Sequence, residues 1–368
     1  MNVIPEYKKV AIIHDSFTEF GGAERVLFSL IKMFPKADVY TSLIRKDFCE
    51  QIKQKSKGKL FFSRLSKLPF AIKNPSFLKP YFYHYYWENL DLNQYDVVIS
   101  SSHSFCANFV KVTNKHISYI YTSPRFLHEE FNEISWLKKP IIKSIMEPYF
   151  RYLRMKITKK LKKIDVVLSD SINVQKRLKK YYKIESKVIY PPTKLAQKNI
   201  IKNTSNPKNY LFFSRLVKQK GIELVIKTFN KNGKPLLVVG TSSQKEKWQK
   251  MAKKNIKFLG FVEDEKMPKI YQKSKALVYA SIDEDFGMIP IEAMSHGIPV
   301  IAFCDGGTIE TIIDRKTGLF FREYNIDSLN KTILKFEKMK FNKNNCIRQA
   351  KKFNEDNFKK QFLEQFYS

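Results

Sequence analysis

The carboxyl-terminal third of the chain contains the stretch that decides the fold, ALVYASIDEDFGMIPIEAMSHGIPVIAF, residues 276–303. Two short apolar runs, Ala276–Tyr279 and Pro299–Phe303, flank a helical segment, which is typical of a strand–helix–strand unit in a parallel sheet. Between the runs, Glu284 and Glu292 stand eight residues apart. Ligands of such sheets bind beyond the carboxyl ends of the strands, so we expect a ligand site here.

The residue types in this stretch suit a ligand that carries phosphate and sugar hydroxyls. Gly287 lets the backbone approach a ligand closely, and the next helix offers free N–H groups and the positive end of its dipole. Glu292, about one to two turns into that helix, can accept two hydrogen bonds from a vicinal diol such as a ribose. The alternative is that Glu284 and Glu292 are ordinary surface carboxylates. For two isolated glutamates that interpretation would be preferred, but the flanking sequence argues against it.

The alternation of apolar runs and helical patterns continues through the whole chain. Helical periodicity follows Gly22 and Gly221. The apolar runs predict further strands at Val10–His14, Asp96–Ser100, Ile117–Tyr121, Val166–Ser169, Tyr210–Phe213, Leu236–Val239 and Lys257–Leu259. Prolines and polar residues in Tyr190–Asn209 are typical of a linker. We therefore expect an α/β protein with an amino-terminal domain at 1–190, a linker at 191–209, a carboxyl-terminal domain at 210–344 and a terminal helix at 345–368.

The composition agrees with two folded domains and a preference for anions. A chain of 368 residues, 43% hydrophobic and 14% aromatic, is not disordered throughout. Its 67 Lys and Arg exceed 35 Asp and Glu, for a net charge of +32, which attracts nucleic acid, anionic membranes or phosphorylated small molecules. The alternative is that much of the lysine of this Lys-, Asn- and Ile-rich chain is solvated surface.

Cysteine usage and hydropathy indicate a location for the protein. The four cysteines, at 49, 106, 304 and 346, form no CxxC pair, and their spacing argues against a disulfide framework or a zinc site. We therefore expect a reducing, cytoplasmic environment. Residues 1–7 lack the pattern of a signal peptide, and no apolar run approaches the length of a membrane span.

Two further motifs place phosphate-binding groups after predicted strands. Arg215 and Lys220 follow the run Tyr210–Phe213 and precede a glycine and a helix. Such cations can stabilise the negative charge on a departing nucleoside diphosphate without a metal, although in so basic a chain they can also be plain surface residues. Near the amino terminus, Gly21 and Gly22 open a helix, which favours close approach of the backbone to a ligand.

Together these motifs resemble glycosyltransferases of family 4, in particular mannosyltransferase-like members of bacterial surface-polysaccharide and lipopolysaccharide assembly. The resemblance implies a GT-B fold, in which two Rossmann-like domains face each other across a cleft, and a retaining mechanism. Its motifs cover most of the chain: Gly21–Arg25, Ser100–His103, Tyr119–His128, Val188–Pro192, Ser214–Gly221, Leu259–Val262, Glu284–Val300 and Gly306–Gly318.

The resemblance also implies roles for individual residues. Arg215 and Lys220 match the pair that binds the diphosphate, Glu284 matches the glutamate beside the donor sugar, and Glu292 matches the one that holds the ribose. The remaining donor-side matches are Phe286, Gly287 and Met288 in the loop beside sugar and phosphate, Phe261 and Val262 near the base, and Gly21 and Gly22 in the loop over the diphosphate.

One position departs from the family pattern. Tyr121 stands where many relatives have a histidine near the sugar, and a tyrosine is a poor base at neutral pH. Either that histidine is dispensable here or His103 or His128 compensates for it, beside Arg125; an inactive relative is the alternative. We interpret the other histidines, at 14, 84, 116 and 296, as structural.

The donor is expected to be a nucleotide sugar, with GDP-mannose first and UDP-glucose, UDP-galactose or UDP-N-acetylglucosamine as alternatives. Asp283-Glu284-Asp285 fits a bare metal-binding D-x-D pattern, but its surroundings resemble the metal-independent family, so no required metal or other cofactor is expected. The rival function is a non-catalytic protein that binds nucleotide sugars.

Two basic segments in the amino-terminal half bear on the acceptor. Lys53–Lys79 contains no acid, and Lys138–Lys163 contains only Glu147. In the second, Ile141, Ile142, Ile145, Tyr149 and Leu153 are predicted to share one helix face. Basic amphipathic helices suit an anionic membrane, so one interpretation is that these segments bind the inner face of the cytoplasmic membrane. The other is that their lysines are ordinary solvated surface residues. No nucleic-acid-binding motif accompanies the charge.

Overall fold

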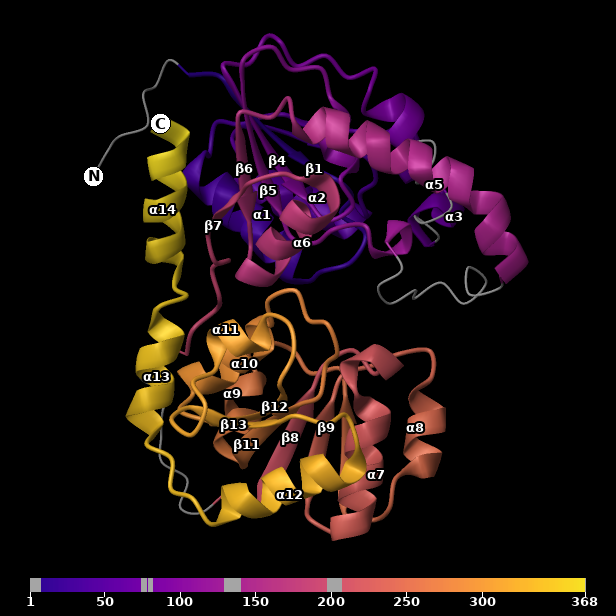
Figure 1. The fold of residues 1–368 in the computed structure, drawn as a ribbon. Coiled ribbons are helices and arrows are strands. Elements are labelled where there is room, and N and C mark those ends of the chain that lie inside the picture. Colours follow the sequence, from indigo (N-terminus) through magenta and orange to yellow (C-terminus); the bar gives the residue numbers. More distant parts are fainter. Residues whose placement is uncertain (1–7, 74–77, 79–81, 129–139, 197–206, 368) are drawn as a thin grey trace. The chain divides into compact units, whose positions relative to one another are not determined.

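The computed structural model describes residues 8–73, 78, 82–128, 140–196 and 207–367. The chain divides into two compact units, an amino-terminal unit of Met1–Pro192 with Phe358–Ser368 and a carboxyl-terminal unit of Thr193–Asn357 (Figure 1). Our expectations for residues 1–7, for Phe77, Lys79, Lys138 and Lys139, and for linker positions 197–206 concern residues outside this description.

The amino-terminal unit contains a parallel sheet with strands in the order β3-β2-β1-β4-β5-β6-β7. The two central strands pair in register, with His14 opposite Ser101. Chain order reverses between β1 and β4, which is the switch point of a doubly wound sheet. The strands are β1 (Val10–His14), β2 (Asp38–Thr41), β3 (Leu60–Phe62), β4 (Val97–Ser102), β5 (Lys115–Ile120), β6 (Val166–Ser169) and β7 (Lys187–Val188).

Helices cover both faces of this sheet because its central strands are apolar on both sides. Ile12 belongs to one buried cluster, with residues of α1, α2 and α14, and its neighbours Ala11 and Ile13 belong to the other, with α3, α5 and α6. The helices are α1 (Gly22–Met33), α2 (Lys46–Lys55), α3 (Pro69–Lys73), α5 (Pro140–Leu161), α6 (Ile172–Tyr182) and α14 (Glu355–Tyr367), with short turns η1 (Arg64–Lys67), η3 (Phe82–Tyr86), η4 (Cys106–Phe109) and η5 (Arg125–Leu127).

The carboxyl-terminal unit repeats the architecture, with strands in the order β10-β9-β8-β11-β12-β13 and a switch point between β8 and β11. Its strands are β8 (Asn209–Phe213), β9 (Leu236–Val239), β10 (Ile256–Gly260), β11 (Ser274–Tyr279), β12 (Val300–Phe303) and β13 (Gly318–Phe321). Its helices are η8 (Lys218–Lys220), α7 (Ile222–Asn232), α8 (Lys245–Met251), α9 (Met267–Gln272), α10 (Met288–Ser295), α11 (Thr308–Thr311), α12 (Ile326–Glu337) and α13 (Lys343–Lys351). Two Rossmann-like sheets confirm the expected fold class.

Strand prediction was incomplete. Each predicted strand overlaps an observed one, but β2, β3, β7 and β13 were missed. These strands have two to four residues, and β2 and β7 mix polar with apolar residues, so they show no continuous apolar run. Strand pairing, rather than local pattern, determines such segments.

The carboxyl-terminal stretch forms two helices where we expected one. The chain leaves α13 at Lys352, and Asn354 accepts a hydrogen bond from the backbone N–H of Asn357 at 2.8 Å, which is a bond that begins a new helix. Phe353 packs edge-on against Phe286 of the carboxyl-terminal unit. Farther along, Phe358, Phe362 and Phe366 are buried in the amino-terminal unit. The last helix therefore completes the core of the unit in which the chain began.

None of the helices that the structure describes combines the length and the apolar composition needed to cross a bilayer.

Candidate functional site

The loops after β8 and β11 meet at the switch point of the carboxyl-terminal sheet. The backbone N–H of Ile282 donates to the carbonyl of Gln219 at 3.0 Å. Gly221 ends the first loop at φ +79°, and a Cβ there would lie 2.2 Å from the carbonyl oxygen of Ala280. The glycine is thus required both by the left-handed backbone and by the close approach. It brings Lys220 beside the loop that carries Glu284.

Lys220 and Glu284 form the centre of the site. The Lys220 Nζ donates to Glu284 Oε2 at 2.7 Å, and the side chains are only 21% and 14% exposed. The hydroxyls of Tyr279 and Ser281 donate to the same oxygen at 2.8 and 2.5 Å. The second carboxylate oxygen, Oε1, takes no part in these three bonds.

The surroundings of the Glu284 carboxyl group favour its deprotonated form. Burial alone would raise the pKa of Glu284, but the Lys220 ammonium and the bonds from Lys220, Ser281 and Tyr279 lower it to about 2. A carboxylate that receives several hydrogen bonds is stabilised in its charged form. Glu284 is therefore an anion at neutral pH, suited to orient hydroxyl donors and unsuited to act as a general acid.

Glu292 belongs to the same neighbourhood. Burial first, and then the carboxylates of Glu284 and Glu292, raise the pKa of Tyr279 well above its ordinary value. Glu292 is half-buried on α10, five residues after Gly287, the N-cap with φ +87°. Both predicted glutamates thus act electrostatically on the buried Tyr279 phenol.

Support for the Glu284 loop comes from residues after β12 that our sequence interpretation gave no role. The Gly307 N–H donates to the carbonyl of Glu284 at 2.8 Å, and Asp305 Oδ2 accepts from the Asp283 N–H at 2.7 Å. A Cβ at Gly306 would lie 2.3 Å from the Glu284 carbonyl oxygen, and one at Gly307 would lie 2.4 Å from that of Asp285. The paired glycines directly after an apolar run were the sequence signal for this approach.

Other predicted donor-side residues lie at the same edge of the sheet but outside the Lys220–Glu284 cluster. Arg215 is exposed after β8, and Phe261, with Val262 beside it, is 77% exposed after β10. The side chain of Phe286 is buried against Phe353, so only its backbone is available to a ligand. Met288, half-buried, begins α10.

In the amino-terminal unit, Gly21 and Gly22 begin α1 after the loop that follows β1. The Gly21 N–H donates to Glu24 Oε2 at 2.8 Å, and Glu24 Oε1 lies 3.6 Å from His14 Nε2. His14 Nδ1 is 2.9 Å from the Ser101 hydroxyl. The glycine loop is therefore tied by Glu24, through His14, to the end of β4.

Asp15 organises the loop that carries His103. It is 2% exposed and accepts from the Ser102 hydroxyl and from the N–H groups of His103, Ser104 and Ala107 at 2.6–2.9 Å. Burial opposes its charge, but the nearby His103 and these N–H groups lower its pKa. His103 Nδ1 lies 3.3 Å from Asp15 Oδ2, and the ring side chain is 35% exposed. Sequence reasoning missed Asp15, for which the only signal was its position directly after a strand.

The alternatives to the missing histidine occupy different places. The Tyr121 hydroxyl lies 2.7 Å from that of Ser101, and burial raises its pKa well above the ordinary value, so it does not serve as a base at neutral pH. His128 stacks on Tyr181 and bonds to Tyr182 of α6, whereas His103 contacts Asp15. Arg125 is half-buried in η5. Of the two proposed alternatives, His103 is therefore the one that lies with Tyr121 and His14 at the ends of β1 and β4.

The remaining histidines have varied surroundings. Burial lowers the pKa of His116 and of His296 to about 4. His116 Nε2 lies 3.0 Å from the Ser100 hydroxyl, and His296 stacks on Tyr271. The side chain of His84 is outside the description.

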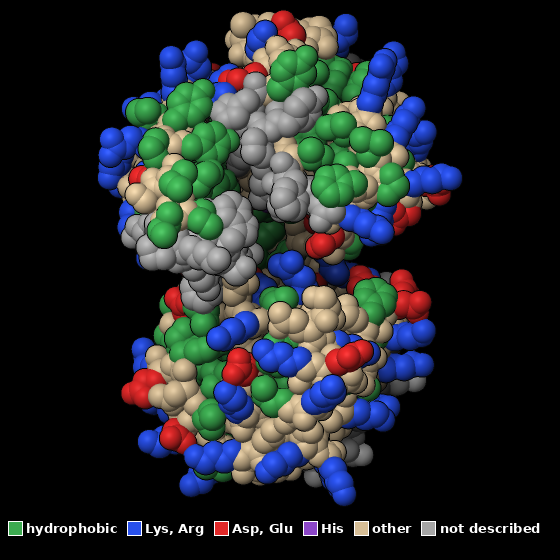
Figure 2. Space-filling view, turned by 90° about the vertical axis from the view of Figure 1, so that its right-hand side faces the viewer, with side chains coloured by type: hydrophobic (Ala, Val, Ile, Leu, Met, Phe, Trp, Pro, Cys, Tyr) green, Lys and Arg blue, Asp and Glu red, His purple; other side chains and the backbone are tan. Residues whose placement is uncertain are grey.

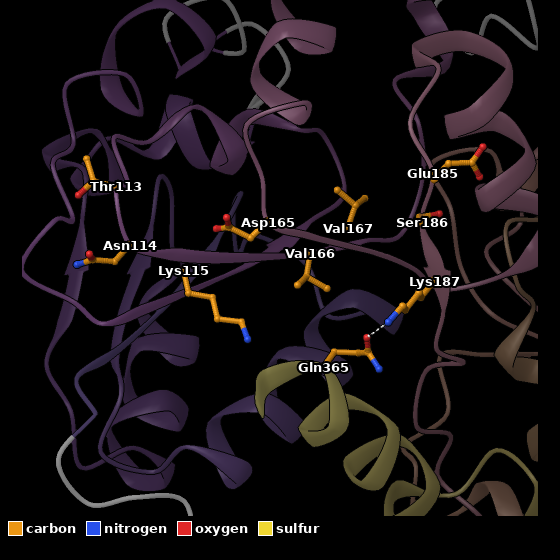
Figure 3. Close-up of a pocket in the computed structure, with 10 residues that line it drawn as sticks. All are labelled: Thr113, Asn114, Lys115, Asp165, Val166, Val167, Glu185, Ser186, Lys187 and Gln365. Atoms are coloured by element: carbon orange, nitrogen blue, oxygen red, sulfur yellow. Dashed lines mark hydrogen bonds between the residues drawn. The ribbon is translucent and has the colours of Figure 1, made fainter. Parts of the chain in front are cut away.

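A cavity of about 760 Å³ lies at the opposite edge of the amino-terminal sheet. Residues at the starts of β5, β6 and β7 line it together with Gln365 of α14 (Figure 3). The Lys187 Nζ donates to Gln365 Oε1 at 2.6 Å, and the Lys115 Nζ donates to the Phe366 carbonyl at 2.9 Å. No predicted site residue lines this cavity, and its lysines attach α14.

Among the described residues, no three His, Cys, Asp or Glu side chains are arranged to hold a metal ion.

The carboxyl-terminal unit is similar to a known protein family. Residues 193–353 match the family model described as glycosyl transferases group 1. The chain is 31% identical to an uncharacterized glycosyltransferase of Methanocaldococcus jannaschii over 131 residues, 33% of this chain and 34% of that protein. It is 28% identical to an alpha-1,3/1,6-mannosyltransferase of Kluyveromyces lactis over 171 residues, 36% and 34% of the two chains. The chain thus spans about a third of the length of these relatives.

Solved structures extend the likeness of fold to the whole chain. The Anabaena protein HepE in complex with UDP-glucose aligns with a TM-score of 0.70 at 17% identity, over 98% of this chain and 100% of that one. The lipopolysaccharide outer core galactosyltransferase WaaB aligns with a TM-score of 0.66 at 18% identity, over 98% and 99%. Residues 193–353, which contain the Lys220–Glu284 site, are thus similar to glycosyl transferases of group 1, and the whole chain has the GT-B fold.

Proposed function

We propose that the protein is a retaining glycosyltransferase that moves a hexosyl unit from a nucleotide sugar to a polysaccharide or lipid-linked glycan. The observation that carries the proposal is the grouping of Lys220, Glu284 and Glu292 at the switch point of the carboxyl-terminal sheet, within the residues that match the family. The proposed location is the cytoplasm, at the inner face of the cytoplasmic membrane.

The cations serve the leaving group. As the bond between sugar and diphosphate breaks, negative charge grows on the diphosphate, and preplaced donors stabilise it without reorganisation. Glu284 holds the Lys220 ammonium in place, and the exposed Arg215 guanidinium can fork two phosphate oxygens. The N–H groups at Gly287 and Met288 add the positive end of α10.

The carboxylates serve the sugars. Glu284 accepts hydrogen bonds from hydroxyls of the transferred hexose, and Glu292 accepts from the two ribose hydroxyls. Phe261 and Val262 lie toward the base. We keep mannose, as GDP-mannose, as the first candidate because the sequences EDFGMIP at 284–290 and PRF at 124–126 resemble mannosyltransferase-like members of family 4. UDP-sugars stay as alternatives because the similar fold of HepE was solved with UDP-glucose.

His103 is our candidate on the acceptor side, together with Arg125. Asp15 orients its half-exposed ring, while Tyr121 remains protonated and His128 is buried against α6. We assign to His103 the role of the histidine that many family members have at the position of Tyr121. This assignment favours a catalytic protein over a non-catalytic protein that binds nucleotide sugars.

The test is a thermal-shift panel of nucleoside diphosphates and nucleotide sugars, followed by turnover of the best radiolabelled donor. A ligand that binds only the folded state raises Tm. One nucleotide class should raise Tm and its sugar should be transferred. A shift without turnover would support the non-catalytic alternative, and no shift with any nucleotide would refute the proposal.

We expect Glu292→Ala to weaken donor binding about 10- to 150-fold, because a hydrogen bond to a charged group contributes about 1.5–3 kcal/mol. Calorimetric titration measures this. Glu246→Ala, which removes an exposed carboxylate on α8, is the control and should bind normally. Unchanged affinity of Glu292→Ala would exclude the ribose role.

We expect EDTA to leave turnover unchanged, since Lys220 and Arg215 supply the positive charge beside the diphosphate. The assay compares initial rates with and without the chelator. Loss of activity that Mg²⁺ or Mn²⁺ restores would contradict the metal-independent mechanism.

A further inference from the structure

Helix α5 has two apolar faces, although packing on one core requires only one. Phe150, Leu153 and Ile157 are buried, with Ile142, Met146 and Tyr149 packed beside them. A second set points outward: Ile141 is 76% exposed, Ile145 71%, Tyr152 47% and Met155 60%. Of the five residues that we predicted to share one helix face, Ile142, Tyr149 and Leu153 pack inward, whereas Ile141 and Ile145 are exposed.

The outward set forms a stripe. Its members follow one another at steps of four, seven and three residues, which keeps them on one side of a helix. From Ile141 to Met155 the stripe extends about 21 Å at 1.5 Å per residue. Four large apolar side chains in a row on solvent mark a contact surface.

Helix α3 and the turn before it carry further exposed apolar side chains of the same unit. Leu68 is 53% and Phe70 62% exposed, while Ala71 of α3 and Phe150 of α5 are buried in one cluster. Figure 2 shows hydrophobic side chains gathered on one face of the amino-terminal unit, with Lys and Arg at its margins. We call Leu68, Phe70, Ile141, Ile145, Tyr152 and Met155 the outer patch.

Positive charge accompanies the outer patch. Arg64, Lys67 and Lys73 are exposed around α3, and Arg151, Lys159, Lys162 and Lys163 are exposed along and after α5. In the described parts of both segments, residues 53–73 and 140–163, the only acid is Glu147, which pairs with Arg154. The partner must therefore accept apolar side chains and carry negative charge.

We propose that the outer patch docks the protein on an anionic lipid bilayer. An interfacial helix inserts its apolar side at the boundary of headgroups and acyl chains, while lysines meet the anionic headgroups. A second copy would bring the same positive charge. Four of the six members of the outer patch are not aromatic, and Phe70 and Tyr152 alone among them could stack on nucleic-acid bases. The inference does not depend on the proposed transferase activity.

Sedimentation of the full chain with vesicles tests the proposal. We expect binding to vesicles of phosphatidylglycerol and phosphatidylcholine, little binding to phosphatidylcholine alone, and a steep loss as salt shortens the screening length from about 8 Å at 0.15 M to about 3 Å at 1 M. Equal binding to both vesicles, or binding to neither, overturns it.

Two triple variants separate charge from apolar contact. Lys159→Gln, Lys162→Gln and Lys163→Gln together should weaken partitioning about 100-fold, at about fivefold for each cation near the surface. Lys160 is left in place because its Nζ donates to the Phe109 carbonyl at 3.1 Å. Ile141→Ser, Ile145→Ser and Met155→Ser together should weaken it at least about tenfold.

Matched triples in the carboxyl-terminal unit are the controls. Lys335→Gln, Lys338→Gln and Lys340→Gln remove the same charge from exposed positions, and Ile309→Ser, Ile313→Ser and Leu334→Ser remove exposed apolar side chains. Both should bind vesicles like the wild type, and Tm reports whether each variant is folded. Equal weakening by test and control triples, or a wild-type dimer that the serine triple dissociates, overturns the assignment.

Discussion

Lys220→Ala should lower kcat about 100- to 1000-fold, the typical effect of removing one preorganised donor from a developing negative charge. Its ammonium lies 2.7 Å from Glu284 Oε2, so the substitution also removes the cation that holds this carboxylate. Steady-state kinetics with the donor found by thermal shift measures the effect. Arg215→Ala should lower kcat by a comparable factor without disturbing Glu284.

Lys218→Ala is the control, because Lys218 lies in the same turn and its side chain is exposed. The Lys218→Ala variant should retain near-normal kcat, in contrast to the Lys220→Ala variant. Near-normal kcat in Lys220→Ala or Arg215→Ala would remove that residue from the mechanism.

Stability against pH gives an independent reading of the Lys220–Glu284 pair. The pKa of Glu284 is lowered to about 2 from an ordinary 4.5, so its contribution to the free energy of unfolding is present above pH 4.5 and lost as pH falls toward 2. Denaturant titrations should therefore show Lys220→Ala less stable than the wild type at pH 7, with a difference that shrinks below pH 4.5.

The second large effect is expected from Gly307→Ala. A Cβ at this position would lie 2.4 Å from the Asp285 carbonyl oxygen and from Phe286 Cα, far inside contact distance, so the Glu284 loop must move. Overpacking of this kind costs about 1–3 kcal/mol. Because the loop bears Glu284 and begins α10, we expect donor affinity to fall more than about tenfold as well, since losing one hydrogen bond to a charged group costs about 1.5–3 kcal/mol.

Gly233→Ala separates loop displacement from simple loss of stability. Gly233 ends α7 at φ +70°, and a Cβ there would meet nothing within 4 Å. Its alanine variant should lose about 1 kcal/mol through backbone strain and bind donor normally. Chemical denaturation and calorimetry measure both quantities. Normal donor affinity in Gly307→Ala would show that the contact with residues 284–286 does not shape the site.

Sequence patterns predicted the long and chemically distinctive features. Strand β1 was predicted with its observed ends because Val10–Ile13 is uniformly apolar and the polar residues Asp15 and Ser16 follow His14. Glu284, Lys220 and Gly287 were recognisable because few residue types bind a diphosphate or permit close backbone approach after a strand. By contrast, β7 has two residues, and no pattern of side chains can define a strand of that length.

The sequence by itself determined the fold class, the family likeness and the candidate donor-side residues, because the side-chain periods and motif spacings that indicate them are local. Only the tertiary structure decided which distant residues meet. Asp15 reaches the loop of Ser102–Ala107 because β1 and β4 pair in the sheet, and Gly307 supports Glu284 because β11 and β12 do. Tertiary structure also decides the orientation of α5, because its outward and inward sides both consist of apolar residues in the sequence. Which apolar side is buried depends on the neighbours that packing supplies, and these lie far away along the chain.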